Sequence, residues 1–354
     1  MRKIKILYVL PDMSNAGPIN MCLSLVREID NRKYDISIFS LGGGHLVNEF
    51  SKYGRVAIFS RKNFLTFAYQ VRKEKFDIIH SHCIIADIFL SLSFPKASLF
   101  TTLHNYLDQD SIFRRGKFIG GLLYLVQKKC ISRFTKVACS NSVKLYCERE
   151  LGMFKINSIS NGVDDLFIDL RLKDNDKCCD FYYLGSLNNR KNVDFILQGF
   201  DLWSKGKNTR LHIIGDGENR KHLEKKFESE NICFYGKINN PISKLTEFDC
   251  FVSASKAEGM PLALLESLSI GNVFICSDID PHKEVYEKCQ ETCGYLFKLD
   301  DCYEDYIQKL DEYYFSIDKN KQSKIARDVF EKNYTSAIMA KAYQDLYEEV
   351  SDIK

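Results

Sequence analysis

The sequence predicts an α/β protein with two domains, each built on a doubly wound parallel sheet. Short apolar runs alternate with amphipathic segments almost to the end of the chain, and this βαβα rhythm favours parallel sheets covered by helices. The 354 residues are enough for about two domains with separate cores. A polar, charged segment at 164–180 without periodicity interrupts the rhythm, and we interpret it as a linker.

The first half of the chain alternates candidate strands with candidate helices. The strands span residues 4–10, 35–41, 55–60, 77–80, 98–103, 136–140 and 155–160. The helices span residues 19–29, 46–53, 63–75, 84–94, 113–134 and 142–151. The first apolar run is short and ends at Pro11, so we predict a strand there rather than a signal segment.

A second series follows the linker. Its strands are predicted at 181–184, 211–214, 232–235, 249–253, 273–276 and 295–299, and its helices at 193–204, 219–229, 242–247, 261–270 and 283–287. Three helical segments, at 303–316, 321–331 and 336–350, then follow without a strand between them. We therefore predict domains at 1–170 and 171–335. Periodicity alone leaves open whether the last segment, 336–354, extends the second domain or returns to the first.

Composition excludes several classes of protein. A net charge of +3 is too small to indicate a nucleic-acid partner, and no apolar stretch reaches the roughly 18 residues of a membrane span. The thirteen cysteines are scattered without a C-x2-C pair. This pattern favours reduced thiols in a cytosolic core over a disulfide framework or a zinc site.

Two glutamates near position 260 carry the strongest chemical signal. Glu258 follows a predicted buried strand, and Glu266 lies in the helix predicted to start at Pro261. Open α/β sheets bind ligands beyond the carboxyl ends of their strands, so both carboxylates are expected at a ligand-binding edge. The alternative is an acidic loop followed by an ordinary helix.

Glycines and cations follow the first strands of the second domain. Gly185-Ser-Leu-Asn-Asn-Arg190-Lys191 precedes a helix, where cations beside helix N–H groups suit a diphosphate, unless they are solvated loop charges. The next strand ends in Gly215-Asp-Gly217. These glycines permit close backbone approach to a nucleotide, or a simple tight turn.

In the first half, Gly17 follows the first strand, and His104 ends the strand containing Thr102. His80 and His82 end another strand, but two alternate strand residues supply too few ligands for a metal site. A lone histidine is more often a structural residue than a functional one.

The order of these motifs resembles family 4 of the retaining nucleotide-sugar glycosyltransferases, which have the GT-B fold. The matching elements are Gly17, Thr-x-His at 102–104, Asn-Gly-Val-Asp at 161–164, Gly-x-Leu-x3-Lys at 185–191, Gly-Asp-Gly at 215–217 and Glu-x7-Glu at 258–266. The resemblance implies two Rossmann-like domains facing across a cleft, with 336–354 packing back on the first. Ser186 stands where the family usually has Arg, and Asp280-Pro281 where it often has Gly-Gly.

The resemblance also implies a function. A retaining, metal-independent glycosyltransferase would move a sugar from a nucleotide-diphosphate sugar to a glycan or lipid-linked acceptor, in bacterial surface polysaccharide synthesis. It would work in the cytoplasm or at the inner face of the membrane, with no cofactor beyond its co-substrate. The implied catalytic residues are Glu258, His104 and Lys191. The implied donor-binding residues are Gly17, Gly185, Ser186, Arg190, Lys191, Gly215, Gly217, Glu258, Gly259, Met260, Pro261, Leu262 and Glu266.

Other interpretations remain. Asp278-Ile-Asp280 is a D-x-D sequence, which binds a metal in GT-A glycosyltransferases, although two successive α/β halves do not suit that fold. A GT-B nucleotide-sugar epimerase and a non-catalytic sugar-nucleotide binder are the alternative functions. Residues 113–129 are basic at both ends and apolar in the middle. We favour a core helix with solvated ends there, and a helix lying on an anionic membrane surface is the alternative.

Overall fold

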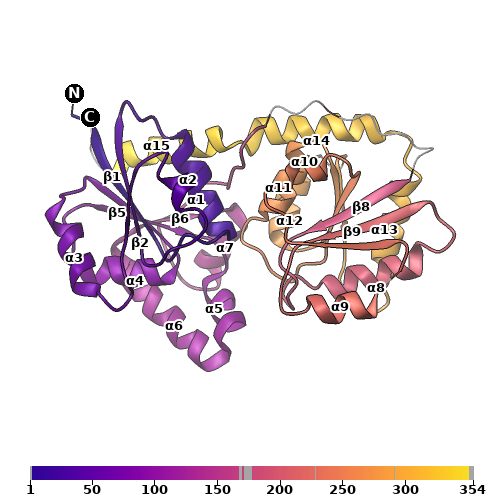
Figure 1. The fold of residues 1–354 in the computed structure, drawn as a ribbon, viewed down its shortest axis with the longest axis horizontal. Coiled ribbons are helices and arrows are strands. Elements are labelled where there is room, and N and C mark those ends of the chain that lie inside the picture. The colour runs from indigo at the N-terminus through magenta and orange to yellow at the C-terminus, as the bar shows by residue number, and fades with distance from the viewer. Residues whose placement is uncertain (1, 167–169, 171–177, 228, 291, 351–354) are drawn as a thin grey trace. The chain divides into compact units, whose positions relative to one another are not determined.

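The structure, a computed structural model, describes residues 2–166, 170, 178–227, 229–290 and 292–350. Within the linker predicted at 164–180, residues 167–169 and 171–177 lie outside the described residues. The chain divides into two compact units (Figure 1). The first comprises Met1–Asp164 and Tyr334–Lys354, and the second Asp165–Asn333.

The first unit is built on a seven-stranded parallel sheet in the order β3-β2-β1-β4-β5-β6-β7. The strands are β1 (Ile4–Leu10), β2 (Tyr34–Ser40), β3 (Arg55–Ile58), β4 (Ile78–His82), β5 (Ser98–Leu103), β6 (Thr135–Ala138) and β7 (Ile156–Ser158). Helices cover both faces, which is why β1 and β4 are buried almost throughout. The strand order reverses between β1 and β4, the kind of switch point at which open α/β sheets bind ligands.

The helices of this unit follow the predicted pattern except in one region. They are α1 (Gly17–Glu28), α2 (Val47–Phe50), α3 (Phe64–Lys73), α4 (Ile84–Ser93), α5 (Leu107–Arg115), α6 (Lys117–Cys130) and α7 (Asn141–Arg149), with a short 3-10 helix η1 (Ile131–Arg133) after α6. The prediction of one helix at 113–134 was wrong. The chain turns at Gly116, whose φ of +77° is accessible to glycine and strained for other residues, so α5 and α6 form a hairpin.

The C-terminal helix α15 (Ser336–Val350) belongs to the first unit. It contacts α1 and places two tyrosines against the sheet. The Tyr347 hydroxyl lies 2.6 Å from Nδ1 of His80 and 3.3 Å from the Tyr8 hydroxyl. The Tyr343 hydroxyl lies 2.9 Å from Oγ1 of Thr102, which in turn lies 2.8 Å from Nε2 of His80. His80 is therefore a structural residue whose two ring nitrogens both have partners.

The second unit has a six-stranded parallel sheet in the order β10-β9-β8-β11-β12-β13. Its strands are β8 (Cys179–Leu184), β9 (Thr209–Ile214), β10 (Ile232–Gly236), β11 (Cys250–Ser253), β12 (Val273–Ser277) and β13 (Gly294–Phe297). Its helices are α8 (Val193–Trp203), α9 (Arg220–Lys226), α10 (Ile242–Leu245), α11 (Leu262–Ser269), α12 (Asp280–Lys288), α13 (Glu304–Tyr314) and α14 (Lys319–Asn333). One aromatic and aliphatic core joins β8, β9 and β11 to α8 and α13.

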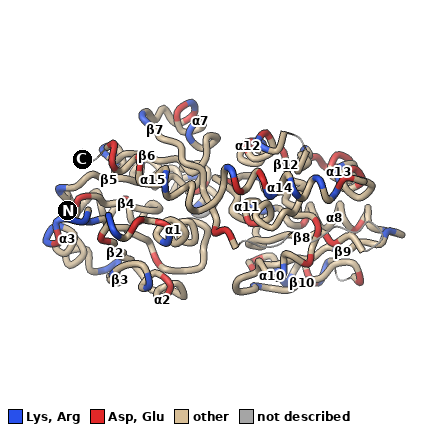
Figure 2. Tube along the Cα trace, turned by 90° about the horizontal axis from the view of Figure 1, so that it is seen from above, with Lys and Arg blue, Asp and Glu red and all other residues tan. Residues whose placement is uncertain are grey.

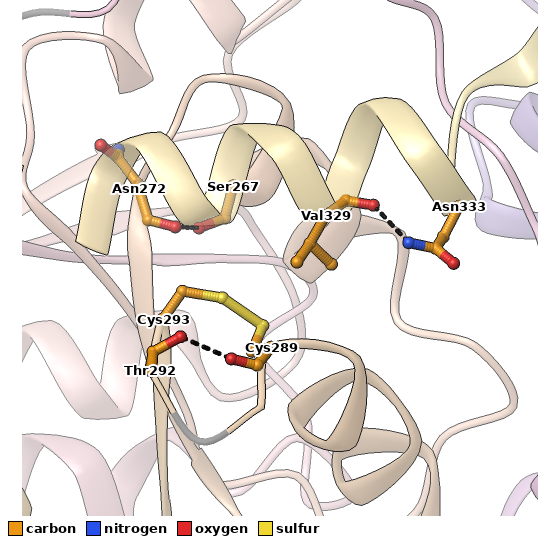
Figure 3. The surroundings of a disulfide bond; sticks show 7 residues. All are labelled: Ser267, Asn272, Cys289, Thr292, Cys293, Val329 and Asn333. Carbon is orange, nitrogen blue, oxygen red and sulfur yellow. Dashed lines mark hydrogen bonds between the residues drawn. A yellow bond between two sulfur atoms is a disulfide. The ribbon is translucent and has the colours of Figure 1, made fainter. Parts of the chain in front are cut away.

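One pair of cysteines forms a disulfide, contrary to the expectation that all the thiols are reduced. Cys289, at the end of α12, forms a disulfide with Cys293, which precedes β13 (Figure 3). Their Cα atoms are 5.4 Å apart, within the range that a disulfide bridges. The turn between α12 and β13 creates this proximity, and the hydroxyl of Thr292 donates to the Cys289 carbonyl within it. The other cysteines are free thiols.

Acidic and basic residues are interleaved along both units (Figure 2), in keeping with the net charge of +3. None of the described helices combines the length and apolar character that crossing a membrane requires.

Candidate functional site

The second unit brings three of the implied site residues into direct contact. Oε2 of Glu258 lies 3.0 Å from Nη1 of Arg190, and Oε1 lies 2.5 Å from Nζ of Lys191. Nη1 of Arg190 also donates to the carbonyl of Ala257 at 2.6 Å. Glu258 is 6% exposed, so the pairs lie in a largely desolvated place. We call Glu258, Arg190 and Lys191 the ion triad.

The sheet topology explains how residues 68 positions apart in sequence meet. Strands β8 and β11 are parallel neighbours, so the loops that follow them leave the same edge of the sheet. Arg190 and Lys191 lie in the loop from β8 to α8, and Glu258 in the loop from β11 to α11. The amide of Lys256 donates to the carbonyl of Arg190 at 2.9 Å, which joins the two loops directly.

The charge state of Glu258 follows from two opposing effects. Burial alone raises the pKa of a carboxyl group, because it disfavours the charged form. The attraction of Lys191 and Arg190, with hydrogen bonds from Lys191 and Ser255, outweighs burial and lowers the pKa of Glu258 to about 2. Glu258 is therefore a carboxylate at neutral pH, unsuited to donate a proton and suited to stabilise positive charge.

Both cations can also bind a further anion. An arginine carries five N–H donors and a lysine three. The hydrogen bonds that the structure describes from these side chains use Nη1 of Arg190 and Nζ of Lys191. Both side chains are partly exposed, with 23% and 17% of their surface accessible. A phosphate can approach such a pair without first breaking its contacts with Glu258.

A polar layer under the ion triad was missed by sequence reasoning. The hydroxyl of Ser277 donates to the carbonyl of Ser255 at 2.6 Å, and Nδ1 of His282 lies 2.7 Å from the carbonyl of Ser277. Burial lowers the pKa of His282 to about 4, so Nδ1–H of a neutral ring donates that bond. These residues support the loop that carries Glu258. Their only sequence signal is a set of polar residues after buried strands, which is too common to identify a site.

The glycines of the second unit pack against one another. A Cβ atom added at Gly215, whose φ is +146°, would lie 1.8 Å from the carbonyl oxygen of Gly185. A Cβ atom added at Gly217 would lie 2.4 Å from the carbonyl oxygen of Leu187. The carbonyl of Ser186 accepts a hydrogen bond from the Tyr183 hydroxyl. The turn after β9 therefore needs glycine at both positions to pack against the loop that follows β8. Contact of these glycines with a nucleotide stays a prediction.

The remaining residues of the Glu-x7-Glu segment surround the start of α11. Gly259, Met260 and Pro261 are buried, and Leu262 is the first residue of the helix, one position later than predicted. Glu266 lies half-buried on α11, eight residues beyond Glu258.

The first unit holds the other implied residues. Gly17 is exposed at the first position of α1, directly after the β1 loop. Nε2 of His104 lies 2.9 Å from Nδ1 of His82, at the adjoining ends of β5 and β4. Burial lowers the pKa of His104 to about 3, so both rings are neutral and one donates to the other. His82 thus orients the side chain of His104, a role that its sequence position did not reveal.

Among the described residues, the two aspartates of the D-x-D sequence belong to no cluster of metal-ligating side chains. Oδ1 of Asp278 lies 3.1 Å from Nζ of Lys283, and Asp280 is the first residue of α12. Across the part of the chain that the structure describes, no three His, Cys, Asp or Glu side chains form a group able to hold a metal ion.

Two family models match the chain. The model described as Glycosyltransferase Family 4 matches residues 17–165, and the model described as Glycosyl transferases group 1 matches residues 179–314. Together they span most of both units.

Individual proteins of similar sequence and structure agree with these models. The chain is 26% identical to the O-antigen biosynthesis glycosyltransferase WclY of Escherichia coli, over 97% of this chain and 98% of the relative. It is 25% identical, over 84% and 85%, to the UDP-Gal:alpha-D-GlcNAc-diphosphoundecaprenol alpha-1,3-galactosyltransferase of the same species. The fold is similar to that of Anabaena HepE in complex with UDP, with a TM-score of 0.82 at 12% identity, covering 98% of this chain and 100% of HepE.

Proposed function

This chain belongs to the group 1 glycosyltransferases with the GT-B fold, and from that premise we propose that it transfers a sugar from a nucleotide-diphosphate sugar to a glycan or lipid-linked acceptor. The place of this reaction would be bacterial surface polysaccharide synthesis. A relative that makes O-antigen and one that uses a diphosphoundecaprenol-linked acceptor support this proposal. The enzyme would act in the cytoplasm, at the inner face of the membrane where such acceptors lie.

The ion triad carries the chemical part of the proposal. Negative charge grows on the leaving nucleoside diphosphate as the bond to the sugar breaks, and fixed cations stabilise that charge without reorganising. Lys191 and Arg190 would bind the phosphates, and Arg190 would replace the arginine absent at Ser186. No metal is required when two cations and backbone N–H groups share this role.

Glu258 would act on the sugar rather than on the phosphates. The transition state of glycosyl transfer has positive charge on the sugar ring, and a carboxylate with a pKa of about 2 remains charged beside it. Retention of configuration would follow if the acceptor attacks from the face that the phosphate leaves, with the phosphate accepting the acceptor's proton. In the first unit, His104, oriented by His82, would contact the donor sugar.

The test starts from ligand binding. Nucleotide-diphosphate sugars are screened by thermal shift, where a ligand at 100 times its Kd adds about 2.7 kcal/mol of stability. The stabilising donor is then incubated with a polyprenyl-diphosphate-linked sugar, and release of nucleoside diphosphate is measured with and without EDTA. We expect release that depends on the acceptor and survives EDTA, with a product whose anomeric configuration matches the donor by NMR.

Each other outcome contradicts a definite part of the proposal. Interconversion of free nucleotide sugars without acceptor would identify an epimerase. Binding without turnover against any acceptor would indicate a sugar-nucleotide binder. Activity lost in EDTA and restored by Mn²⁺ would contradict metal-independent phosphate binding and direct attention to Asp278 and Asp280.

A further inference from the structure

Helix α6 turns an apolar stripe outward instead of into a core. Phe118 is 93% exposed, Leu122 64% and Leu125 59%. Their spacings of four and three residues place them on one face of the helix. The expectation of a core helix with solvated ends at 113–129 was therefore wrong, because the apolar middle of the segment lies at the surface.

The opposite face of α6 is firmly attached, so the outward direction of the stripe is determined. A Cβ atom added at Gly120 would lie 2.5 Å from the carbonyl oxygen of Ser111, which shows how closely α5 and α6 approach. Further along, Nε2 of the buried Gln127 donates to Oδ2 of Asp87 on α4 at 2.8 Å. Gly120 and Gln127 anchor one side of the helix, and Phe118, Leu122 and Leu125 lie on the other.

The turn of the hairpin extends the same apolar surface. Phe113 near the end of α5 and Ile119 in the first turn of α6 are both exposed, on either side of Gly116. In Figure 1 the two helices form an arm at the lower edge of the first unit. We call Phe113, Phe118, Ile119, Leu122 and Leu125 the hairpin surface. It is a projecting surface rather than a groove, so it suits insertion into a partner better than enclosure of one.

The charged residues beside the hairpin turn are basic, and the two aspartates of α5 lie in its first turn, at the end of the helix away from Gly116. No Asp or Glu occurs from Ser111 to Cys147, whereas acidic and basic residues are interleaved elsewhere along the chain (Figure 2). Arg115, Lys117 and Lys129 are exposed beside the apolar residues. An apolar helix face flanked by cations is the pattern of helices that lie in the interface of an anionic membrane.

We propose that the α5–α6 hairpin docks this protein on an anionic lipid bilayer, with the hairpin surface among the acyl chains and the three cations at the lipid phosphates. A second copy of the chain fits the surface less well, because a two-fold contact would bring the same cations together. The proposal deepens the proposed function, since a lipid-linked acceptor lies at such a bilayer. Its test nevertheless needs neither donor nor acceptor.

Binding of the full chain to vesicles tests the proposal. Wild-type protein is sedimented with phosphatidylcholine vesicles and with vesicles that also contain phosphatidylglycerol. We expect binding to the anionic vesicles only, weakening as salt is raised. Phe118→Ser with Leu122→Ser should lower the partition coefficient at least tenfold, because burial of two apolar side chains is lost. Lys117→Gln with Lys129→Gln should lower it about fivefold per cation.

A matched control uses equally exposed apolar residues elsewhere. Leu65 on α3 is 81% exposed and Ile317 after α13 is 87% exposed, so Leu65→Ser with Ile317→Ser should leave vesicle binding unchanged. Melting temperatures report whether each variant remains folded. Turnover of a water-soluble acceptor analogue by the Phe118→Ser, Leu122→Ser variant should equal that of wild type, which separates loss of docking from failure of the site.

Three results would overturn the proposal. If wild-type protein does not bind anionic vesicles, the hairpin surface is not a membrane-docking surface. Equal loss of binding in the control variant would mean that general hydrophobicity is responsible. Concentration-dependent dimers that disappear in the Phe118→Ser, Leu122→Ser variant would show that a second copy occupies the hairpin surface instead.

Discussion

Arg190 shares Glu258 with Lys191, so its contribution to phosphate binding needs its own measurement. We predict that Arg190→Ala weakens donor affinity about tenfold or more, since a charge-assisted hydrogen bond contributes roughly 1.5–3 kcal/mol. Titration with the nucleotide sugar measures the effect. Lys283→Ala is the control, because Lys283 belongs to a more exposed ion pair with Asp278 and should leave donor affinity unchanged. Equal donor affinity in Arg190→Ala and wild type would mean that Arg190 only forms the ion pair with Glu258 and does not bind the phosphates.

Substitutions of the two glutamates of the Glu-x7-Glu segment are expected to change different quantities, one the turnover rate and the other the nucleotide affinity. Glu258→Gln removes the charge that stabilises the transition state, so kcat should fall while affinity for the bare nucleoside diphosphate stays close to wild type. Glu266→Gln should weaken that affinity, because its expected contacts with the ribose exist before and after transfer. Calorimetric titration of the nucleoside diphosphate beside steady-state kinetics separates the two effects. Equal loss of nucleotide affinity in both variants would contradict this division of roles.

At the scale of elements, the attachment of α15 depends on the hydroxyl of Tyr347. Tyr347→Phe removes the partner of Nδ1 of His80, and a buried polar atom left unsatisfied costs about 1–3 kcal/mol. We expect a loss of that size in the free energy of unfolding, measured by urea denaturation. Tyr34→Phe is a close control, since the buried Tyr34 hydroxyl has no hydrogen-bond partner among the described residues. That variant should be neutral or slightly more stable. Equal losses would mean that the hydroxyl of Tyr347 contributes nothing specific.

At the scale of the whole molecule, buried histidines should make the protein sensitive to mild acid. Burial lowers the pKa of His80 and that of His104 to about 3. It also lowers the pKa of His82 well below 6.5 and that of His282 to about 4. Below pH 6.5 the unfolded chain therefore binds protons that the folded chain does not, and stability falls as the pH falls. Glu258, with its pKa of about 2 in the folded state, adds a further loss only below about pH 4.5.

The two units should differ in this sensitivity. His80, His82 and His104 lie in the first unit and His282 in the second, so the first should lose about 4 kcal/mol per pH unit between about pH 6 and 4, and the second about 1.4. Trp203, the single tryptophan, reports unfolding of the second unit by fluorescence. Hydrogen exchange at β1 and β4 amides reports the first. Stability of the first unit that stays constant from pH 7 to pH 4 would contradict the depressed pKa values.

Much of the architecture was predictable because it depends on local periodicity. Strands β1 and β5 and helix α15 have the predicted bounds, since their apolar patterns begin and end at clear breaks. The hairpin at Gly116 was missed because residues 113–134 were interpreted as one helix that continues past a glycine, and only the folded chain reveals the positive φ of that glycine. The same limit applies to Cys289 and Cys293, whose C-x3-C spacing says nothing about a disulfide until the α12–β13 turn places them together.

The sequence by itself determined the order of most strands and helices and the loops at strand ends, and it placed Arg190, Lys191 and Glu258 in such loops. Only the tertiary structure decided that Arg190 and Lys191 share the buried carboxylate of Glu258, because the adjacency of β8 and β11 is a long-range pairing. Only the tertiary structure also decided that Phe118 lies in solvent. Periodicity identifies two faces of a helix, but the packing of its neighbours determines which of them is covered.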